Sequence, residues 1–165
     1  WVWLPLALPA LPLVTGQYAI ALHLGIDGHY AAVLWSHLLW VLPWMLLVLQ
    51  PAWRRIDSRL ILTARTLGWR RTKIFLLLKC PLLVRPALLA FATGFSVSMA
   101  QYMPTLWLGA GRFATLTTET VALSSGGSIP ILANRALGLL LVTGTVFGLA
   151  ALLSRLVGRY RQGLR

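Results

Sequence analysis

The chain has 165 residues, of which 58% are apolar and 11% are charged, and its formal net charge is +12. A soluble domain usually has about 25% charged residues, so this composition argues against an ordinary soluble fold and favours membrane-spanning helices. The positive charge does not indicate nucleic-acid binding, because the Lys and Arg residues lie between apolar runs, as they do beside the spans of membrane proteins. The single cysteine, Cys80, excludes an internal disulfide and a multi-cysteine metal site.

The apolar runs predict an all-α membrane protein with about four transmembrane helices in a single domain. The predicted spans cover about residues 1–22, 30–50, 82–103 and 131–155. Three prolines in the first run predict a kinked or partly broken helix there: Pro5, Pro9 and Pro12. The chain starts WVWLPLALPA, without Met or the basic segment of a signal peptide, so we expect it to be the C-terminal piece of a longer protein.

The basic residues fall into two clusters that predict the orientation of the chain. Residues 54–85 hold nine of them and residues 155–165 hold four, which together are thirteen of the fifteen. Two predicted spans separate the clusters, so both clusters lie on one side of the membrane, and the positive-inside bias makes that side the cytoplasm. We therefore predict a cytoplasmic loop at 51–81, cytoplasmic ends for this segment, and an outer loop at 104–128.

The segment from Asp57 to Pro81 is a basic, amphipathic stretch that predicts two short helices. Asp57 or Ser58 suits the N-cap of the first helix, and Gly68 suits the position just past its end. The second helix is predicted to start near Trp69 and to end at Pro81, because the residue before a proline disfavours helical geometry. Such a projection can dock into a groove on a partner protein; the alternative is a basic helix lying on anionic lipid headgroups.

The same segment resembles the EAA loop of ABC importer permeases, whose pattern is E-A-A-x3-G-x9-I-x-L-P. Gly68 and Pro81 have the required spacing, Ala64 matches the second alanine, and Leu78 stands for the isoleucine. Leu62 replaces the family glutamate, Thr63 replaces the first alanine and Cys80 replaces the leucine. The resemblance extends over about residues 30–165, and the stretch TLTTETVALSSGG is similar to the outer loop of one subgroup of this family.

The resemblance implies part of a type I ABC importer permease, a multi-pass protein of the bacterial inner membrane. In that family the loop is a coupling helix that seats in a cytoplasmic ATP-binding subunit, which holds the ATP. Carried over to this sequence, the coupling residues are Leu60, Ile61, Ala64, Arg65, Leu67, Gly68, Arg70 and Pro81. The other implied partners are the lipid bilayer, a periplasmic or extracellular solute-binding protein and a second permease half, which forms a homodimer, a heterodimer or a fused chain.

The sequence has few features of an enzyme. GWRRTKIF lacks the glycine spacing of a phosphate-binding loop, and the three acidic residues are scattered, so we expect neither catalysis nor a cofactor bound by this chain. His23 and His29 flank a polar turn, where they are either interfacial residues or part of a metal or substrate-delivery site. His37 lies inside a span, where it is either a functional group or a hydrogen-bonded packing residue. The alternatives are therefore a secondary transporter or channel, and a membrane-embedded enzyme that uses these histidines.

The third predicted span carries small and polar residues in its second half. Thr93, Ser98 and Gln101 are our candidates for the translocation path, although close helix packing is an equally good reason for such residues. In the outer loop, residues 115–125 predict a short helix capped by Thr117 or Thr118. Glu119 is predicted to cap a helix or to pair with Arg112.

Overall fold

The computed structural model describes residues 2–124, 126 and 129–162, and every regular element in this part is helical, as predicted. Some residues of the predicted first span, outer loop and basic tail lie outside it: Trp1, Ser125, Gly127, Ser128 and residues 163–165. The elements are α1 (Leu4–Ala7), α2 (Ala10–His23), α3 (Tyr30–Arg54), α4 (Ser58–Thr66), α5 (Arg71–Ile74), the π-helix η1 (Phe75–Lys79), α6 (Cys80–Met99), α7 (Met103–Leu108), α8 (Leu116–Ser124) and α9 (Ile129–Gln162).

Three helical segments in the described part of the chain are long and apolar enough to cross a membrane: Tyr30–Arg54, Arg71–Met99 and Ile129–Val157. The other predicted span, at 1–22, contains no single helix of this length, so the total of about four spans stays a prediction. The segment predicted to span at 1–22 consists of α1 and α2, and Leu8 between them is extended (φ −91°, ψ 146°) because Pro9 follows it. The predicted break is present, and α2 alone reaches only about 21 Å of the roughly 30 Å hydrocarbon core.

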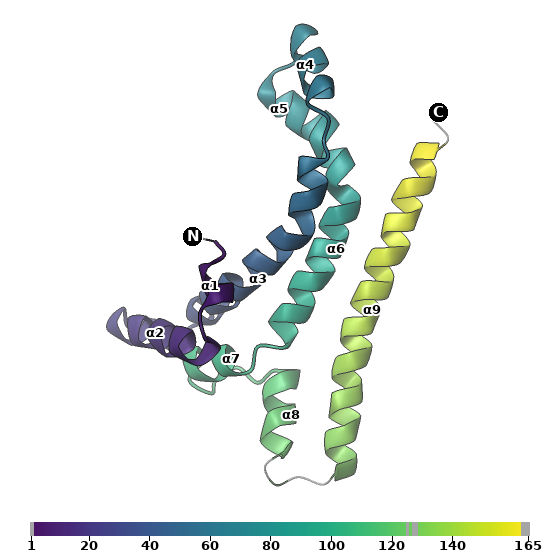
Figure 1. Ribbon diagram of the computed structural model, residues 1–165. Coiled ribbons are helices and arrows are strands. Elements are labelled where there is room, and N and C mark those ends of the chain that lie inside the picture. The colour runs from purple at the N-terminus through teal and green to yellow at the C-terminus, as the bar shows by residue number, and fades with distance from the viewer. Residues whose placement is uncertain (1, 125, 127–128, 163–165) are drawn as a thin grey trace.

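The long helices lie side by side (Figure 1). α6 packs against α3 on one side and against α9 on the other. α4 and α5 project at one end of the molecule, where α9 also finishes, whereas α7 and α8 lie at the opposite end (Figure 1). The loop and the end of α9 thus lie at the same end, as the positions of the two basic clusters require; the assignment of this end to the cytoplasm stays a prediction.

α3 and α6 approach closely at Gly94, which is buried in α6. A Cβ atom built at Gly94 would lie 2.7 Å from both Cγ and Sδ of Met45 and 3.0 Å from Cγ1 of Val41. Small residues permit this kind of approach between helices in a membrane. Gly94 therefore sets the packing distance between the two helices that lead to and from α4.

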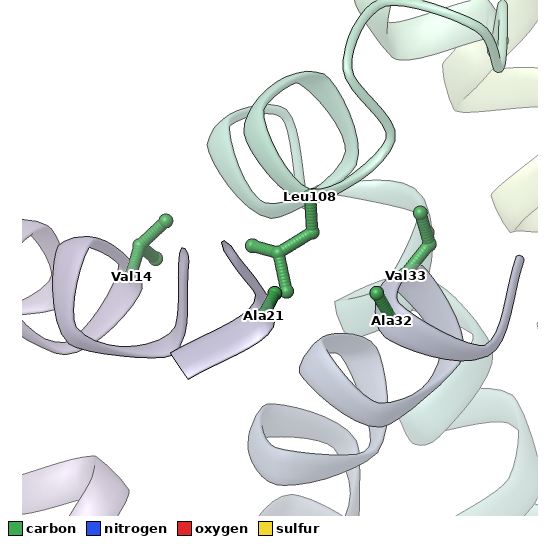
Figure 2. Close-up of a cluster of buried hydrophobic side chains, with 5 residues drawn as sticks. All are labelled: Val14, Ala21, Ala32, Val33 and Leu108. Atoms are coloured by element: carbon green, nitrogen blue, oxygen red, sulfur yellow. The ribbon is translucent and has the colours of Figure 1, made fainter. Parts of the chain in front are cut away.

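A small apolar cluster joins α2, α3 and α7 at the end opposite α4 (Figure 2). Leu108 of α7 is fully buried above Ala21 of α2 and beside Val33 of α3 (Figure 2). The carbonyl of Leu108 also accepts a 2.8 Å hydrogen bond from the N–H of Gly28, whose φ of +69° suits glycine. The cluster fixes α7 against the start of α3.

The second helix of the loop does not end at Pro81, which corrects the prediction. α5, η1 and α6 form one continuous helix, and Cys80 keeps helical angles (φ −53°, ψ −50°) although a proline follows. The N–H of Cys80 donates to the carbonyl of Phe75, five residues earlier, which is π-helical geometry. The wider turn accommodates a proline that has no N–H and whose ring would clash with a normal α-helical turn.

Two predictions for the outer loop are also corrected. α8 forms within the predicted stretch, but Thr115 caps it: Oγ1 of Thr115 accepts from the N–H of Thr118, and Oγ1 of Thr118 accepts from the N–H of Thr115. This reciprocal pair works like a capping box. Glu119 neither caps α8 nor pairs with Arg112; its carboxylate lies 2.9 Å from Nη1 of Arg135 on α9.

Candidate functional site

The projecting α4 begins and ends at residues suited to those positions. Oδ1 of Asp57 accepts a 2.8 Å hydrogen bond from the N–H of Arg59, so Asp57 is the N-cap, as predicted. At the other end, Gly68 has a φ of +76°. Its N–H donates to the carbonyl of Arg65, and the N–H of Trp69 donates to the carbonyl of Ala64. These two bonds form a Schellman motif, which turns the chain back toward α5.

The apolar residues among the predicted coupling residues of α4 differ in burial. Ala64 is 5% exposed and Ile61 is half-buried, so these two residues hold α4 against its own loop. Leu60 and Leu67 are exposed. Leu62, which occupies the position of the family glutamate, is 63% exposed and was not among the predicted coupling residues. The sequence signal for Leu62 was available, because a leucine replaces a charged residue of the family pattern at this position.

A groove of about 660 Å³ lies between α4 and the following helix. Its lining combines apolar and basic side chains: Ile61, Arg65, Arg71, Thr72, Ile74, Phe75, Leu76 and Lys79. The lining includes the predicted Arg65 but no acidic residue, and Arg70 is exposed beside it. Pro81 lies in α6, below the projection. The projection thus offers exposed leucines and unneutralised positive charge, which suit an acidic surface with apolar hollows.

A second site lies deeper, where His37 of α3 joins α6 and α7. Its Nδ1 lies 2.8 Å from Oγ of Ser98, and its Nε2 lies 2.8 Å from Oγ1 of Thr105. The only proton of the Thr105 hydroxyl goes to the carbonyl of Gln101, at 2.7 Å. Nε2 of His37 must therefore donate to Thr105, and in the neutral ring Nδ1 accepts from Ser98. The side-chain amide of Gln101 completes the polar cluster by donating to the carbonyl of His37, at 3.3 Å.

An open pocket of about 550 Å³ adjoins this polar cluster. His37, Ser98 and Thr105 line it together with the aromatic rings of Tyr30 and Phe113. Arg112 supplies the charge in the lining, which contains no acidic residue. The pocket can bind a solute through hydroxyl and aromatic groups, and it contains no pair of groups arranged for acid–base chemistry.

The polar cluster contains two of the three predicted path residues, Ser98 and Gln101. The third, Thr93, donates to the carbonyl of Leu89 in its own helix, at 3.0 Å, and does not line the pocket. Thr105 was missed, because it lies in a stretch predicted to be irregular. The MPTLWL run around it has the apolar spacing of a short helix and was the available signal.

The histidine-based alternatives gain no support from the geometry. In the described part of the chain, no three His, Cys, Asp or Glu side chains gather where they could hold a metal ion. Nδ1 of His29 lies 3.1 Å from the carbonyl of Asp27, within its own turn. His37 is hydrogen-bonded to neighbouring helices, which agrees with the packing interpretation.

Comparison with known proteins supplies a close relative. The inner membrane ABC transporter permease protein YnjC of Escherichia coli (strain K12) is 67% identical to this chain over 165 residues, which are the whole chain and 32% of that protein. The chain thus spans about a third of the length of this relative. No description of a protein family matches the chain. No solved structure matches it either.

The relative confirms the resemblance to ABC transporter permeases and, within them, to a YnjC-like subgroup. The name of this relative places it in the inner membrane, and three apolar helices suited to spanning occur in the described part of this chain. The chain is therefore closely similar to one segment of an inner membrane ABC transporter permease.

Proposed function

We propose that this chain, a close homologue of one segment of an ABC transporter permease, couples a cytoplasmic ATP-binding subunit to a solute path through the inner membrane. The observation that carries the proposal is the position and surface of α4. This helix projects beyond the ends of α3 and α6 (Figure 1), and both its start and its end are fixed by caps. A rigid, exposed helix between two spans can transmit motion from a soluble partner to both spans at once.

The contact with the ATP-binding subunit is expected to be mainly apolar. Leu62 and Leu67 are exposed at 63% and 68%, and with the exposed Leu60 they give α4 an apolar surface of the kind that a partner covers. Arginines beside them, including Arg65, add complementarity to an acidic rim. ATP binds to that partner, and the contribution of this chain to the contact is the docking helix.

The solute path is proposed to pass the pocket at His37. Ser98, Gln101 and Thr105 meet there at the junction of α3, α6 and α7. A change in the angle between α3 and α6 alters this junction, because both helices contribute to it. The remaining partners are a solute-binding protein on the outer side and a second permease half, both of which follow from the relative's class.

The experiment is co-purification of the full-length protein with its ATP-binding subunit from membranes. Replacing two exposed leucines, Leu62→Asp with Leu67→Asp, should abolish recovery of the subunit, because two carboxylates are then buried against apolar hollows. Glu119→Gln on α8 is the control, since it lies at the opposite end and should leave recovery unchanged (Figure 1). Full recovery with the double variant, at normal expression and membrane insertion, would refute the proposal. A secondary transporter or channel predicts no ATP-binding subunit at all.

A further inference from the structure

A second groove lies below α4, on the flank of the helix pair α3 and α6. Its volume is about 570 Å³. Three segments build it: the last turns of α3, the turn into α4, and the first half of α6. The lining consists of Val48, Pro51, Ala52, Arg55, Ile56, Asp57, Leu60, Leu82, Arg85, Pro86 and Leu89. It shares no residue with the groove beside α5 or with the pocket at His37.

The wall of this groove on α6 is apolar and follows the helix axis. Leu82 and Leu89 are seven residues apart, so they lie on the same face about 10 Å from each other along α6. Both are exposed, at 40% and 41%. Val48 and Pro51 form the opposite wall on α3. The groove thus offers an apolar channel that runs from the end of the predicted span toward the interior of the membrane. An acyl chain requires a channel of this direction.

The polar end of the groove carries an excess of one positive charge. Arg55 and Arg85 line it together with a single carboxylate, Asp57. Nε of Arg85 donates to the carbonyl of Ser154 on α9, at 2.8 Å, so only the two Nη groups of this guanidinium are left for a ligand in the groove. All three acidic residues lie in the described part of the chain, and the one ion pair found there joins Glu119 to Arg135. Neither groove arginine is therefore neutralised by a salt bridge within this part.

We propose that this groove binds one anionic glycerophospholipid with a single phosphate, of the phosphatidylglycerol type. The phosphate lies between Arg55 and Arg85, which are planar donors suited to phosphate oxygens. One acyl chain lies along Leu82 and Leu89. Basic pockets between transmembrane helices on the cytoplasmic side bind acidic headgroups through the same pairing of positive side chains with phosphate. The net charge of the groove matches one phosphodiester, and Asp57 disfavours a headgroup with a second negative charge. The inference rests on the span assignment and not on docking of the ATP-binding subunit.

The test is native mass spectrometry of the full-length protein after exchange into a detergent that contains equal phosphatidylglycerol and phosphatidylethanolamine. Wild type should retain one phosphatidylglycerol in preference to phosphatidylethanolamine. Arg55→Gln and Arg85→Gln should each lower this retention about fivefold, as expected for about 1 kcal/mol per basic residue near a lipid surface. Asp57→Asn should raise it, because asparagine is also a good N-cap and only the charge is lost. Soluble glycerol phosphate should not compete, since it lacks the acyl chain.

Arg65→Gln is the matched control, because Arg65 is an exposed arginine of the same loop that does not line this groove. An equal loss of lipid from this variant would replace the proposal with diffuse attraction to the basic loop. Equal retention of both lipids by wild type would overturn it as well. Arg55 is exposed, so the Arg55→Gln protein should fold normally. This variant keeps the test valid if the Arg85→Gln protein fails to fold. Absence of any retained lipid in wild type would also overturn the proposal.

Discussion

The ring of His37 donates from Nε2 to the hydroxyl of Thr105, with 2.8 Å between the two atoms. This bond joins the first third of α3 to α7, the short helix that follows α6. Thr105 is 1% exposed, so bulk water does not reach its hydroxyl group and cannot take the place of either hydrogen-bond partner. The direction of the bond is fixed because the hydroxyl proton of Thr105 is used by the carbonyl of Gln101. Thr105 therefore acts toward His37 only as an acceptor.

Thr105→Val tests this direction, because valine has nearly the same shape but no acceptor. The N–H of His37 is then left without a partner, and we expect a loss of about 1–3 kcal/mol in the free energy of unfolding. Thr105→Ser keeps the acceptor and loses one methyl group, which should cost about 0.8 kcal/mol. Thermal unfolding of the purified full-length protein in detergent compares the two. A valine variant as stable as the serine variant would show that this bond contributes nothing.

Gly94→Ala should weaken the packing of α3 against α6. The new Cβ would lie 2.7 Å from two atoms of Met45, so the methionine must move or the helices must separate. We expect a loss of about 1–3 kcal/mol, the usual range for overpacking. Met45→Ala in the same protein should restore part of that stability, since it removes the obstructing atoms. The unfolding midpoints of both single variants and the double variant measure this coupling, and strictly additive effects would contradict it.

Gly68→Ala should disturb the end of α4 through the backbone alone. No atom lies within 4 Å of the added methyl group, but the φ of +76° disfavours residues with a side chain by about 1–2 kcal/mol. Gly68→Asn should be milder, because asparagine adopts this conformation more readily. Gly138→Ala is the control, since Gly138 has open space and lies within a helix. Proteolytic sensitivity of the loop should rise in the order control, asparagine, alanine; equal sensitivity would argue against a role for this φ angle.

The ion pair between Glu119 and Arg135 is expected to contribute little to stability. Both side chains are 45% exposed, and exposed pairs contribute about 0–1 kcal/mol. Glu119→Gln should therefore shift the unfolding midpoint only slightly, and added salt should reduce even that shift. Exchange of the two charges, Glu119→Arg with Arg135→Glu, should restore the small loss. A large loss on Glu119→Gln would indicate a contact of Glu119 other than this ion pair.

Local capping rules were sufficient to predict α4 from the sequence. The carboxylate of Asp57 caps the first turn of α4. Gly68 has no side chain and therefore adopts the positive φ angle that ends the helix. Pro81 was predicted wrongly because the sequence does not reveal that η1 widens the helix before it. The break in the first predicted span could be predicted because Pro9 disfavours helical geometry at Leu8, whereas the role of this segment as a span stays a prediction.

The site residues show the same contrast between local and long-range information. Ser98 and Gln101 could be singled out because polar residues are rare inside spans, and their place in the translocation path stays a prediction. Thr105 was not found, because its role depends on α7 folding back onto α3, a contact across 68 residues. The partner of Glu119 was also missed, since Arg135 reaches it only through the way α8 packs against α9. Long-range contacts of this kind leave no periodic pattern in the sequence.

Cysteine cross-linking tests the central proposal, that α4 docks onto an ATP-binding subunit, most directly. In a full-length protein whose native cysteines, Cys80 included, are replaced by serine, Leu62→Cys and Leu67→Cys are introduced one at a time and labelled in membranes with a short reagent that carries a thiol-reactive and a photoreactive group. We predict cross-links to the ATP-binding subunit from both positions, and none from Ala122→Cys, which is exposed on α8 at the opposite end. Cross-links from position 122 and none from positions 62 and 67 would contradict the account.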